Sequence, residues 1–317
     1  GATTHCEISG VTDYKAKDDK DALDKIKKIF DKIGDSDKAG FNRVAAQPPE
    51  LDPEGLFGAL PRARNAQYDM MELINRMVDA NSFEAYKDGY GQTLITGYAR
   101  MDGWAVGIVA NQRKIVKTKK GEMQFGGVIY SDSADKATRF IANCNQKKIP
   151  LVFLQDVTGF MVGSKSEHGG IIKDGAKMVN AVSNSVVPKF TVIIGNSYGA
   201  GNYAMCGKAY DPRLIFAWPT AELAVMSGNS AAKVLMQIEK ASLEKAGKKL
   251  SEEEEKALFA KTKDRYDKQV SPYYAASRIW TDGIIDPRDT RKWISMGIEA
   301  ANHAPITKDF NLGIIQT

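Results

Sequence analysis

The sequence lacks several features that would assign a function at once. It has no apolar run long enough to cross a bilayer, since even FTVIIG at 190–195 ends after six residues. It contains no P-loop, no G-x-G-x-x-G turn between a strand and a helix, and no H-E-x-x-H helix. These absences argue against a membrane-spanning protein, a dinucleotide-binding enzyme and a zinc protease.

Cysteine is also scarce. Cys6, Cys144 and Cys206 are an odd number without metal-ligand spacing, so we expect neither a disulfide framework nor a metal site, and a reducing cytoplasm fits best. The N-terminus has neither the basic start nor the apolar core of a secretory signal, and it does not begin with Met. We therefore expect a cytoplasmic protein of which this chain is a fragment.

Charge of one sign is not concentrated either. The net charge is +5, and the lysines of 115–122 are not grouped with aromatic residues, which is typical of a solvated face. We expect no nucleic-acid partner, although a positive excess favours an anionic ligand such as a nucleotide-bearing thioester. With 317 residues, 43% of them hydrophobic, the chain can bury the core of one large domain or two ordinary ones.

The N-terminal part divides into a helix and a connector. Apolar residues recur at helical spacing over 18–33, which predicts an amphipathic helix ended by Gly34, its apolar face carrying Leu23, Ile26, Phe30 and Ile33. The next segment, 34–66, holds four prolines without periodicity, which is typical of a connector. We place a domain boundary near residue 67.

Strands and helices alternate after this connector. Two strands, 93–101 and 103–113, meet at Asp102-Gly103, a dipeptide that predicts an antiparallel hairpin. Helices then alternate with apolar strands, which predicts an α/β fold with a parallel sheet covered on both faces, in the order 133–146, 150–156, 170–184 and 189–196. The C-terminal part is mostly helical, with a capping box at Ser251 and Glu254, Pro272 in a first turn, and a turn at 280–291.

One motif invites a hydrolase hypothesis. Gly195–Gly199 reads G-N-S-Y-G, a nucleophile elbow after a strand, and Asp282 or Asp286 and then His303 follow in the order of an α/β-hydrolase triad. His168-Gly169-Gly170 imitates an oxyanion loop. Replacement of Ser197 by Ala separates the hypotheses, because a hydrolase would lose essentially all activity.

The small residues after Ser197 favour a second hypothesis. In YGAGNYAM, at 198–205, backbone N–H groups of a helical first turn can converge on a developing oxyanion, although a merely tight turn is the alternative. On this hypothesis Gly201→Val blocks the approach to the amides and lowers turnover more than stability. No nucleophilic side chain is needed.

A similar Gly-rich turn lies at 155–170, after another strand. The two turns should meet at the carboxyl edge of the sheet, where α/β folds bind ligands. Phe160 and Met161 beside Gly159 could form an apolar wall for a ring or belong to the core. The nearby acids are candidate bases, or else caps and solvated charges: Asp156, Glu167 and Glu222.

At these turns the chain resembles the acyl-CoA-dependent biotin carboxyltransferases, which include propionyl-CoA and methylcrotonyl-CoA carboxylase β subunits. Within that family it most resembles the glutaconyl-CoA decarboxylase α subunit. The resemblance covers nearly the whole chain, through residues 1–14, 68–79, 125–141, 150–164, 197–226 and 279–291.

The resemblance implies a crotonase-like ββα superhelix of the ClpP/crotonase superfamily with two related halves per subunit. Residues 1–66 would then be the tail of the N-terminal half and a connector, and 67–317 the C-terminal carboxyltransferase domain. The first half, which normally supplies most of the acyl-CoA site, is mostly absent from this chain. The active site would form between the first half of one subunit and the second half of another in a homo-oligomer.

The resemblance also implies roles for individual residues. The backbone amides of Ala200 and Gly201 would form the oxyanion hole for the ureido oxygen of biotin, and the backbone of Gly159 and Phe160 would hold its bicyclic ring. Thr158 stands where a proline is common in the family, so the role of Gly159 and Phe160 is carried over from the family on weaker grounds than that of Ala200 and Gly201. Carboxyl transfer through CO2 leaves one anion on the thioester and one on biotin, so oriented donors can carry most of the catalysis.

These residues and the resemblance lead to the hypothesis of a carboxyltransferase. Such an enzyme would move the carboxyl group of an acyl-CoA thioester to biotin on a separate biotin carrier protein. The expected acyl-CoA is glutaconyl-CoA, which would give crotonyl-CoA. The alternatives are a methylcrotonyl-CoA-type carboxylase β subunit, a serine hydrolase using Ser197, and a module that only docks the biotin carrier. The resemblance also allows a membrane-embedded decarboxylase partner subunit that would hold the protein at the membrane.

Overall fold

The computed structural model describes residues 1–34, 36–63, 66–245 and 251–317, so parts of the predicted connector at 34–66 lie outside it. The helices are α1 (Asp19–Ile33), α2 (Leu56–Ala59), α3 (Met70–Ile74), α4 (Ser131–Gln146), α5 (Ser164–His168), α6 (Ile171–Ser183), α7 (Gly199–Ala204), α8 (Gly228–Lys245), α9 (Glu252–Gln269), α10 (Pro272–Ser277) and α11 (Thr290–Asn302). The strands are β1 (Glu84–Ala85), β2 (Leu94–Met101), β3 (Trp104–Asn111), β4 (Val116–Lys117), β5 (Met123–Gln124), β6 (Val128–Ile129), β7 (Leu151–Val157), β8 (Gly159–Phe160), β9 (Lys189–Tyr198), β10 (Leu214–Ala217), β11 (Glu222–Ala224) and β12 (Gly283–Ile284).

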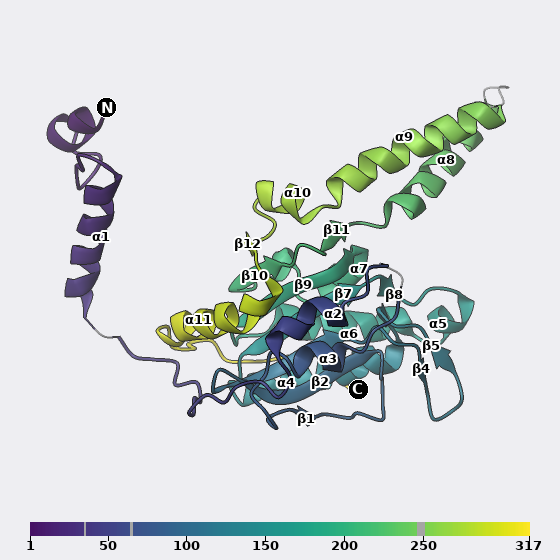
Figure 1. Cartoon of the computed structure of the whole chain (residues 1–317), viewed down its shortest axis with the longest axis horizontal. Coiled ribbons are helices and arrows are strands. Elements are labelled where there is room, and N and C mark those ends of the chain that lie inside the picture. The colour runs from purple at the N-terminus through teal and green to yellow at the C-terminus, as the bar shows by residue number, and fades with distance from the viewer. Residues whose placement is uncertain (35, 64–65, 246–250) are drawn as a thin grey trace.

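A twisted mixed sheet forms the centre of the molecule (Figure 1). Its strand order is β1-β2-β3-β7-β9-β10-β12, and β11 pairs with the end of β9. β2 and β3 are antiparallel, and Asp102 and Gly103 between them have φ values of 55° and 79°, which confirms the predicted hairpin. From β3 to β12 all pairs are parallel, as the alternation of strands and helices predicts.

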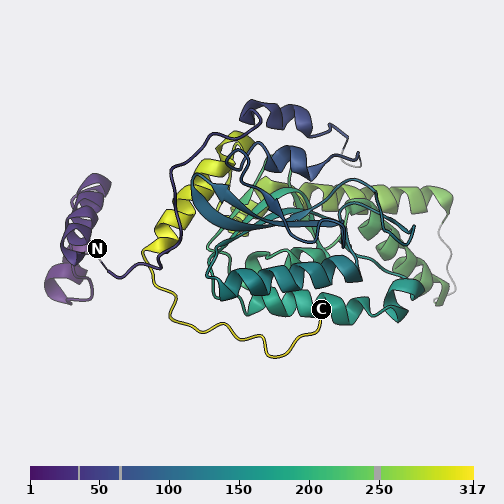
Figure 2. The same cartoon turned by 90° about the horizontal axis from the view of Figure 1, so that it is seen from below.

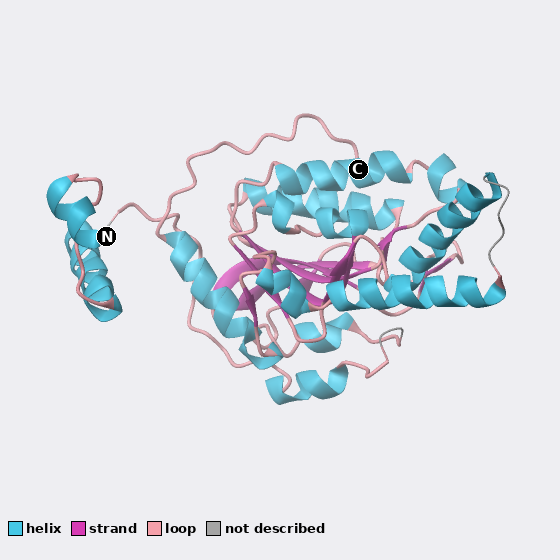
Figure 3. Cartoon of the chain, turned by 90° about the horizontal axis from the view of Figure 1, so that it is seen from above, coloured by secondary structure: helices cyan, strands magenta, loops and turns pink. Residues whose placement is uncertain are grey.

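Helices cover both faces of this sheet (Figures 2 and 3). Val152 and Leu154 of β7 pack in one core with α3 and α11, whereas Leu151 and Phe153 pack in a second core with α4 and α6. All seven residues of β7 are buried, which is the burial expected of a parallel strand between two helical layers. The prediction of a doubly covered α/β sheet is confirmed.

Two parts extend from this body (Figure 1). α1 lies apart from the sheet, and the side chains of its predicted apolar face are 49–68% exposed at Leu23, Ile26, Phe30 and Ile33. The α8–α9 pair extends beyond the sheet, and the predicted capping box begins α9 at Ser251. None of the described helices is both long and apolar enough to cross a membrane.

The described part of the connector packs on the body. Phe41 and Leu56 are buried in the core beneath α3 and α11. The backbone of 42–44 runs beside the β2–β3 hairpin, where Val44 N–H donates to the carbonyl of Gly103 at 3.1 Å. The division of the chain at residue 66 remains a prediction.

Candidate functional site

The two Gly-rich turns meet at the carboxyl edge of the sheet. β7 runs through Thr158 into β8, and the neighbouring strand β9 runs directly into α7. A Cβ added at Gly201 would lie 3.2 Å from the Cα of Gly159, so the two backbones are in van der Waals contact. The structure therefore brings together Gly159, Phe160, Ala200 and Gly201.

The surface above this contact is open. A Cβ at Gly159 would meet no atom of the described residues within 4 Å, and its φ of 148° is one that other residues rarely adopt. Ala200 is exposed, and no side chain caps the start of α7. Since the first amides of a helix have no partner within the helix, those of this turn can bind an anionic oxygen that approaches from outside.

The structure corrects the expectation for Gly201. A Cβ there would lie 2.6 Å from Val157 Cγ2, which points into the contact between the turns rather than toward the open surface. Gly201→Val would therefore disturb packing as well as ligand approach, so it does not separate turnover from stability.

The side chain of Phe160 belongs to the core. A Cβ at Gly175 of α6 would lie 2.8 Å from Phe160 Cε1, so this glycine leaves room for the ring. The partly buried ring packs against the core, which is the alternative that the sequence left open beside an apolar wall. Met161 instead borders a separate cavity on the outer side of the turn.

Ser197 lacks the environment of a nucleophile. Its side chain is 1% exposed, donates to Gln155 Oε1 at 2.6 Å and accepts from Asn202 Nδ2 at 2.8 Å. His303 lies at the end of α11 beside Glu299, and His168 ends α5. Among the residues that the structure describes, no histidine is paired with Ser197, so the hydrolase hypothesis lacks its Ser–His pair.

Asp156 is a buried acid directly beneath the two turns. It is 6% exposed, and its carboxylate accepts from Asn196 N at 2.9 Å and from Tyr68 Oη at 2.9 Å. Arg113 Nε lies 3.2 Å from Asp156 Oδ2. Burial, together with this carboxylate, raises the pKa of the Tyr68 phenol well above its usual value.

The Asp156–Arg113 pair also supports the β8 turn. A Cβ at Gly127 would lie 2.0 Å from Arg113 Nη1, so the guanidinium packs directly on this glycine. The carbonyl of Gly127 then accepts the N–H of Thr158 at 2.7 Å. The carboxylate is thus a structural anchor for the ends of β7 and β9 rather than an accessible base.

The other acids also lie outside a general-base position. Glu222 on β11 hydrogen-bonds the hydroxyl of Tyr198, and Glu167 is exposed on α5. Within the described ranges, no three His, Cys, Asp or Glu side chains are arranged to hold a metal ion. Asp156 and its partner Arg113 are the residues whose role sequence reasoning missed, because they are separated by 43 positions and carry no motif.

Comparison with known proteins places this arrangement in context. A family model described as a carboxyl transferase domain matches residues 1–312. The mitochondrial methylcrotonoyl-CoA carboxylase β chain of Arabidopsis thaliana is 43% identical over 100% of this chain and 52% of its own length. The chain spans about half the length of the curated relatives it matches.

Solved structures of carboxylase and transcarboxylase subunits have a similar fold. The β subunit of geranyl-CoA carboxylase from P. aeruginosa is 34% identical with a TM-score of 0.78, over 99% of this chain and 57% of that one. The transcarboxylase 12S structure, described as a hexamer assembly with hydrolysed methylmalonyl-CoA bound, is 34% identical with a TM-score of 0.68. That match covers 95% of this chain and 55% of the other.

Proposed function

The chain belongs to the carboxyl transferase domain family, with its crotonase-like α/β fold, and from this premise we propose that it supplies the biotin-facing half of an acyl-CoA carboxyltransferase site. The observation that carries the proposal is the contact of two backbone turns, Gly159 against Gly201, beneath an open surface. Asp156 is buried beneath that surface, and Glu222 is hydrogen-bonded to the hydroxyl of Tyr198. The chemistry of the surface is therefore that of oriented amides.

In this proposal the chain binds the biotin ring and orients amide donors toward the oxygen that becomes negatively charged. The amides of Ala200 and Gly201, at the first turn of α7, hold the ureido oxygen where negative charge develops. The open backbone at Gly159 and Phe160 admits the bicyclic ring without a side chain in the way. Biotin, carried on a separate protein, supplies the ring that accepts or releases the carboxyl group. Amides held in place by the sheet need no reorganisation during the reaction, which is what makes such donors effective.

The names of the relatives support a proposal for the direction and the substrate of the reaction. The Arabidopsis relative is named for methylcrotonoyl-CoA and the geranyl-CoA carboxylase for another branched acyl group. These names favour an acyl-CoA carboxylase of the methylcrotonyl type over the glutaconyl-CoA decarboxylase expected from the sequence. We therefore propose a branched acyl-CoA as the carboxyl acceptor.

The partners follow from what this chain contains. The chain spans about half the length of its relatives. We therefore propose that a second half-site holds the thioester, and that this half-site belongs either to the same subunit or to a second subunit. We propose a homo-oligomer, as in the hexamer named for transcarboxylase 12S. A biotin carrier protein would complete the assembly.

Ala200→Leu tests the amide hole. Ala200 is exposed, so we expect a change of less than about 0.5 kcal/mol in the free energy of unfolding. The larger side chain covers the first turn of α7, and carboxyl exchange between acyl-CoA and free biotin should fall by about 10²-fold, the usual effect of losing one such donor. The exchange is measured in the complete enzyme.

Ala300→Leu is the matched control, since Ala300 is also an exposed helical alanine but lies on α11. It should change neither quantity. If Ala200→Leu keeps the activity of the control variant, the amides of α7 do not hold the reacting oxygen.

A further inference from the structure

A buried side-chain amide lies beneath the turn that contains Ala200 and Gly201. Gln155 of β7 is 0% exposed. Its Nε2 donates to the carbonyl of Met205 at 2.7 Å, and its Oε1 accepts the hydroxyl of Ser197 at 2.6 Å. Ser197 precedes the turn on β9, and Met205 follows the last residue of α7. One side chain therefore holds the backbone on both sides of the turn.

The hydrogen bonds allow only one orientation of this amide. A backbone carbonyl can only accept, so the atom of Gln155 that faces Met205 is the nitrogen. The hydroxyl of Ser197 accepts from Asn202 Nδ2 at 2.8 Å, which leaves its proton for Gln155 Oε1. Because Asn202 lies on α7, the network joins β7, β9 and α7. A buried network with every bond directed in this way holds its elements in one arrangement.

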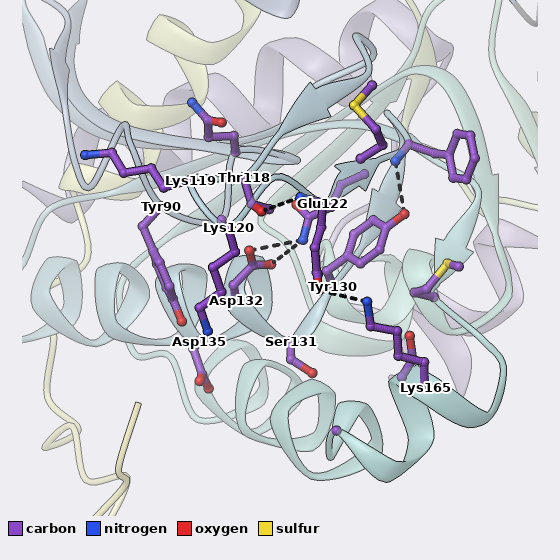
Figure 4. Close-up of a pocket in the computed structure, with 18 of the residues that line it drawn as sticks. Tyr90, Thr118, Lys119, Lys120, Glu122, Tyr130, Ser131, Asp132, Asp135 and Lys165 are labelled. Atoms are coloured by element: carbon purple, nitrogen blue, oxygen red, sulfur yellow. Dashed lines mark hydrogen bonds and ion pairs between the residues drawn. The ribbon is translucent and has the colours of Figure 1, made fainter.

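The turn itself has few side chains that could fix its position. Gly199, Ala200 and Gly201 carry at most a methyl group, and Ala200 is exposed. The neighbouring β8 turn is bordered on its outer side by a cavity of about 910 Å³, between the β4–β5 hairpin and the start of α4 (Figure 4). The position of the two turns is therefore set mainly from the buried side, where Gln155 lies.

The strand pairing on this buried side is irregular. Gln155 pairs with Ile193 and Val157 pairs with Ser197, so four steps along β9 match two steps along β7. Irregular pairing of this kind bends a strand and is common beside active sites. Ser197 keeps a strand partner in Val157, whereas the Met205 carbonyl lies at the end of α7, where carbonyls have no partner within the helix. The donor that holds that carbonyl is Gln155 Nε2.

We infer that Gln155 is a positioning residue for carboxyl transfer, because it sets the direction of α7 and of the amides of Ala200 and Gly201. This inference rests on the proposed function, since those amides must hold the ureido oxygen for their direction to matter. Gln155 is buried and acts only through α7. That helix has six residues and is about 9 Å long, so a shift of its end at Met205 is passed on to its first turn.

Gln155→Met removes both hydrogen bonds with a side chain of similar length. The carbonyl of Met205 loses its donor, and a displacement of about 1 Å at the amides should lower the kcat of carboxyl exchange with free biotin by about 10²-fold. The KM for acyl-CoA should stay within about twofold, because the thioester binds in the other half-site. The exchange is measured in the complete enzyme at a temperature where the variants are folded.

Asn145→Leu is the matched control for the loss of a buried amide. Asn145 is 2% exposed, and its Oδ1 accepts the N–H of Val186 at 2.8 Å, just before β9 begins and at the end of that strand opposite the turns. Its Nδ2 donates to the carbonyl of Ile141 at 2.9 Å. The control should lower the midpoint of denaturant unfolding, as Gln155→Met does, but keep kcat within about twofold. Equal kcat values for the two variants would overturn the inference and leave the proposed function intact.

A double-variant cycle with Ala200→Leu tests the route of the effect. Ala200→Leu already covers the amides, so adding Gln155→Met should lower kcat by less than about twofold more. If the effects of the two substitutions multiply, Gln155 does not act through these amides and the inference is wrong.

Ser197→Ala in the Gln155→Met background separates positioning from stability. It removes a buried hydroxyl that has lost its acceptor, and the half-buried Asn202 amide can reach water, so the midpoint of unfolding should rise again. The Met205 carbonyl still lacks its donor, so kcat should stay low. If kcat recovers together with the midpoint, Gln155 contributes stability alone and the inference is wrong. If the unaltered enzyme exchanges no carboxyl with free biotin, the proposed function itself fails, and the inference fails with it.

Discussion

Asp156→Asn removes the charge that joins the two turns while keeping the shape of the side chain. Asp156 and Arg113 each have about 8% of their side-chain surface exposed, so the variant leaves a buried guanidinium without its carboxylate. Breaking a buried pair in this way costs about 3–5 kcal/mol. An Asn also offers a single oxygen where the carboxylate accepts from both Asn196 and Tyr68.

The stability assay is thermal or denaturant unfolding of the variant and of a short series around it. Arg113→Met in the Asp156→Asn background removes the buried cation that has lost this carboxylate and should recover about 1–3 kcal/mol. Tyr68→Phe removes one hydrogen bond and should cost about 1 kcal/mol, which calibrates the loss of a single contact.

The kinetic assay is carboxyl exchange at a temperature where every variant is folded. Because Arg113 packs on Gly127, whose carbonyl holds Thr158, loss of the pair should displace the β8 turn. A displacement of about 1 Å at a positioning group can cost about 10²-fold in rate. We expect lower kcat for Asp156→Asn, partial recovery in the double variant, and an unchanged pH profile, since the carboxylate does not act as a base.

Two results would refute this reasoning. If the free energy of unfolding of Asp156→Asn is within about 1 kcal/mol of that of the unaltered protein, the Asp156–Arg113 pair is not a structural anchor. If stability falls but kcat in the folded variant does not, the pair supports the fold without positioning the turn.

Three further predictions concern buried groups. Ser197→Ala should keep most of the activity but cost about 1–3 kcal/mol of stability, because two side-chain partners lose their contact; loss of all activity in folded protein would restore the hydrolase hypothesis. Gly201→Ala should destabilise the protein through contact with Val157, and Val157→Ala should rescue it in unfolding assays; a failure of rescue would contradict the observed contact. Burial lowers the pKa of Lys136 to about 8, so between about pH 8 and 10.5 the unfolded chain binds more protons and stability rises with pH. Across that pH window the free energy of unfolding should rise by about 1–3 kcal/mol more in the unaltered protein than in Lys136→Met. If the free energy of unfolding depends on pH in the same way in both proteins, the pKa of Lys136 is not lowered by burial.

Local signals predicted most of the sheet and its helices. Asp102-Gly103 predicted a hairpin because both residues must adopt positive φ, and both do. Ser251 and Glu254 predicted the start of α9 because a capping box needs only residues three apart. The apolar strand at 150–156 predicted a buried parallel strand, and β7 is buried along its whole length.

The detail of the site could not be predicted because it depends on long-range contacts. Whether the Phe160 ring faces a ligand or the core is decided by Gly175 on another helix. The direction of a Cβ at Gly201 is likewise decided by Val157 on another strand. Sequence reasoning located both turns at one edge of the sheet, but it could not tell which glycine faces the open surface and which faces the other turn.

The same geometry supports the proposal that a second half-site covers these turns. Amide donors stabilise an oxyanion strongly only where water is excluded. Around the two turns, however, Val162, Val225 and Tyr203 are 74%, 73% and 47% exposed. Val225 belongs to the same surface, because a Cβ at Gly199 would lie 3.0 Å from its carbonyl oxygen. Apolar side chains beside an open polar backbone favour an interface, so we expect the exchange rate to depend on the second half-site that covers them.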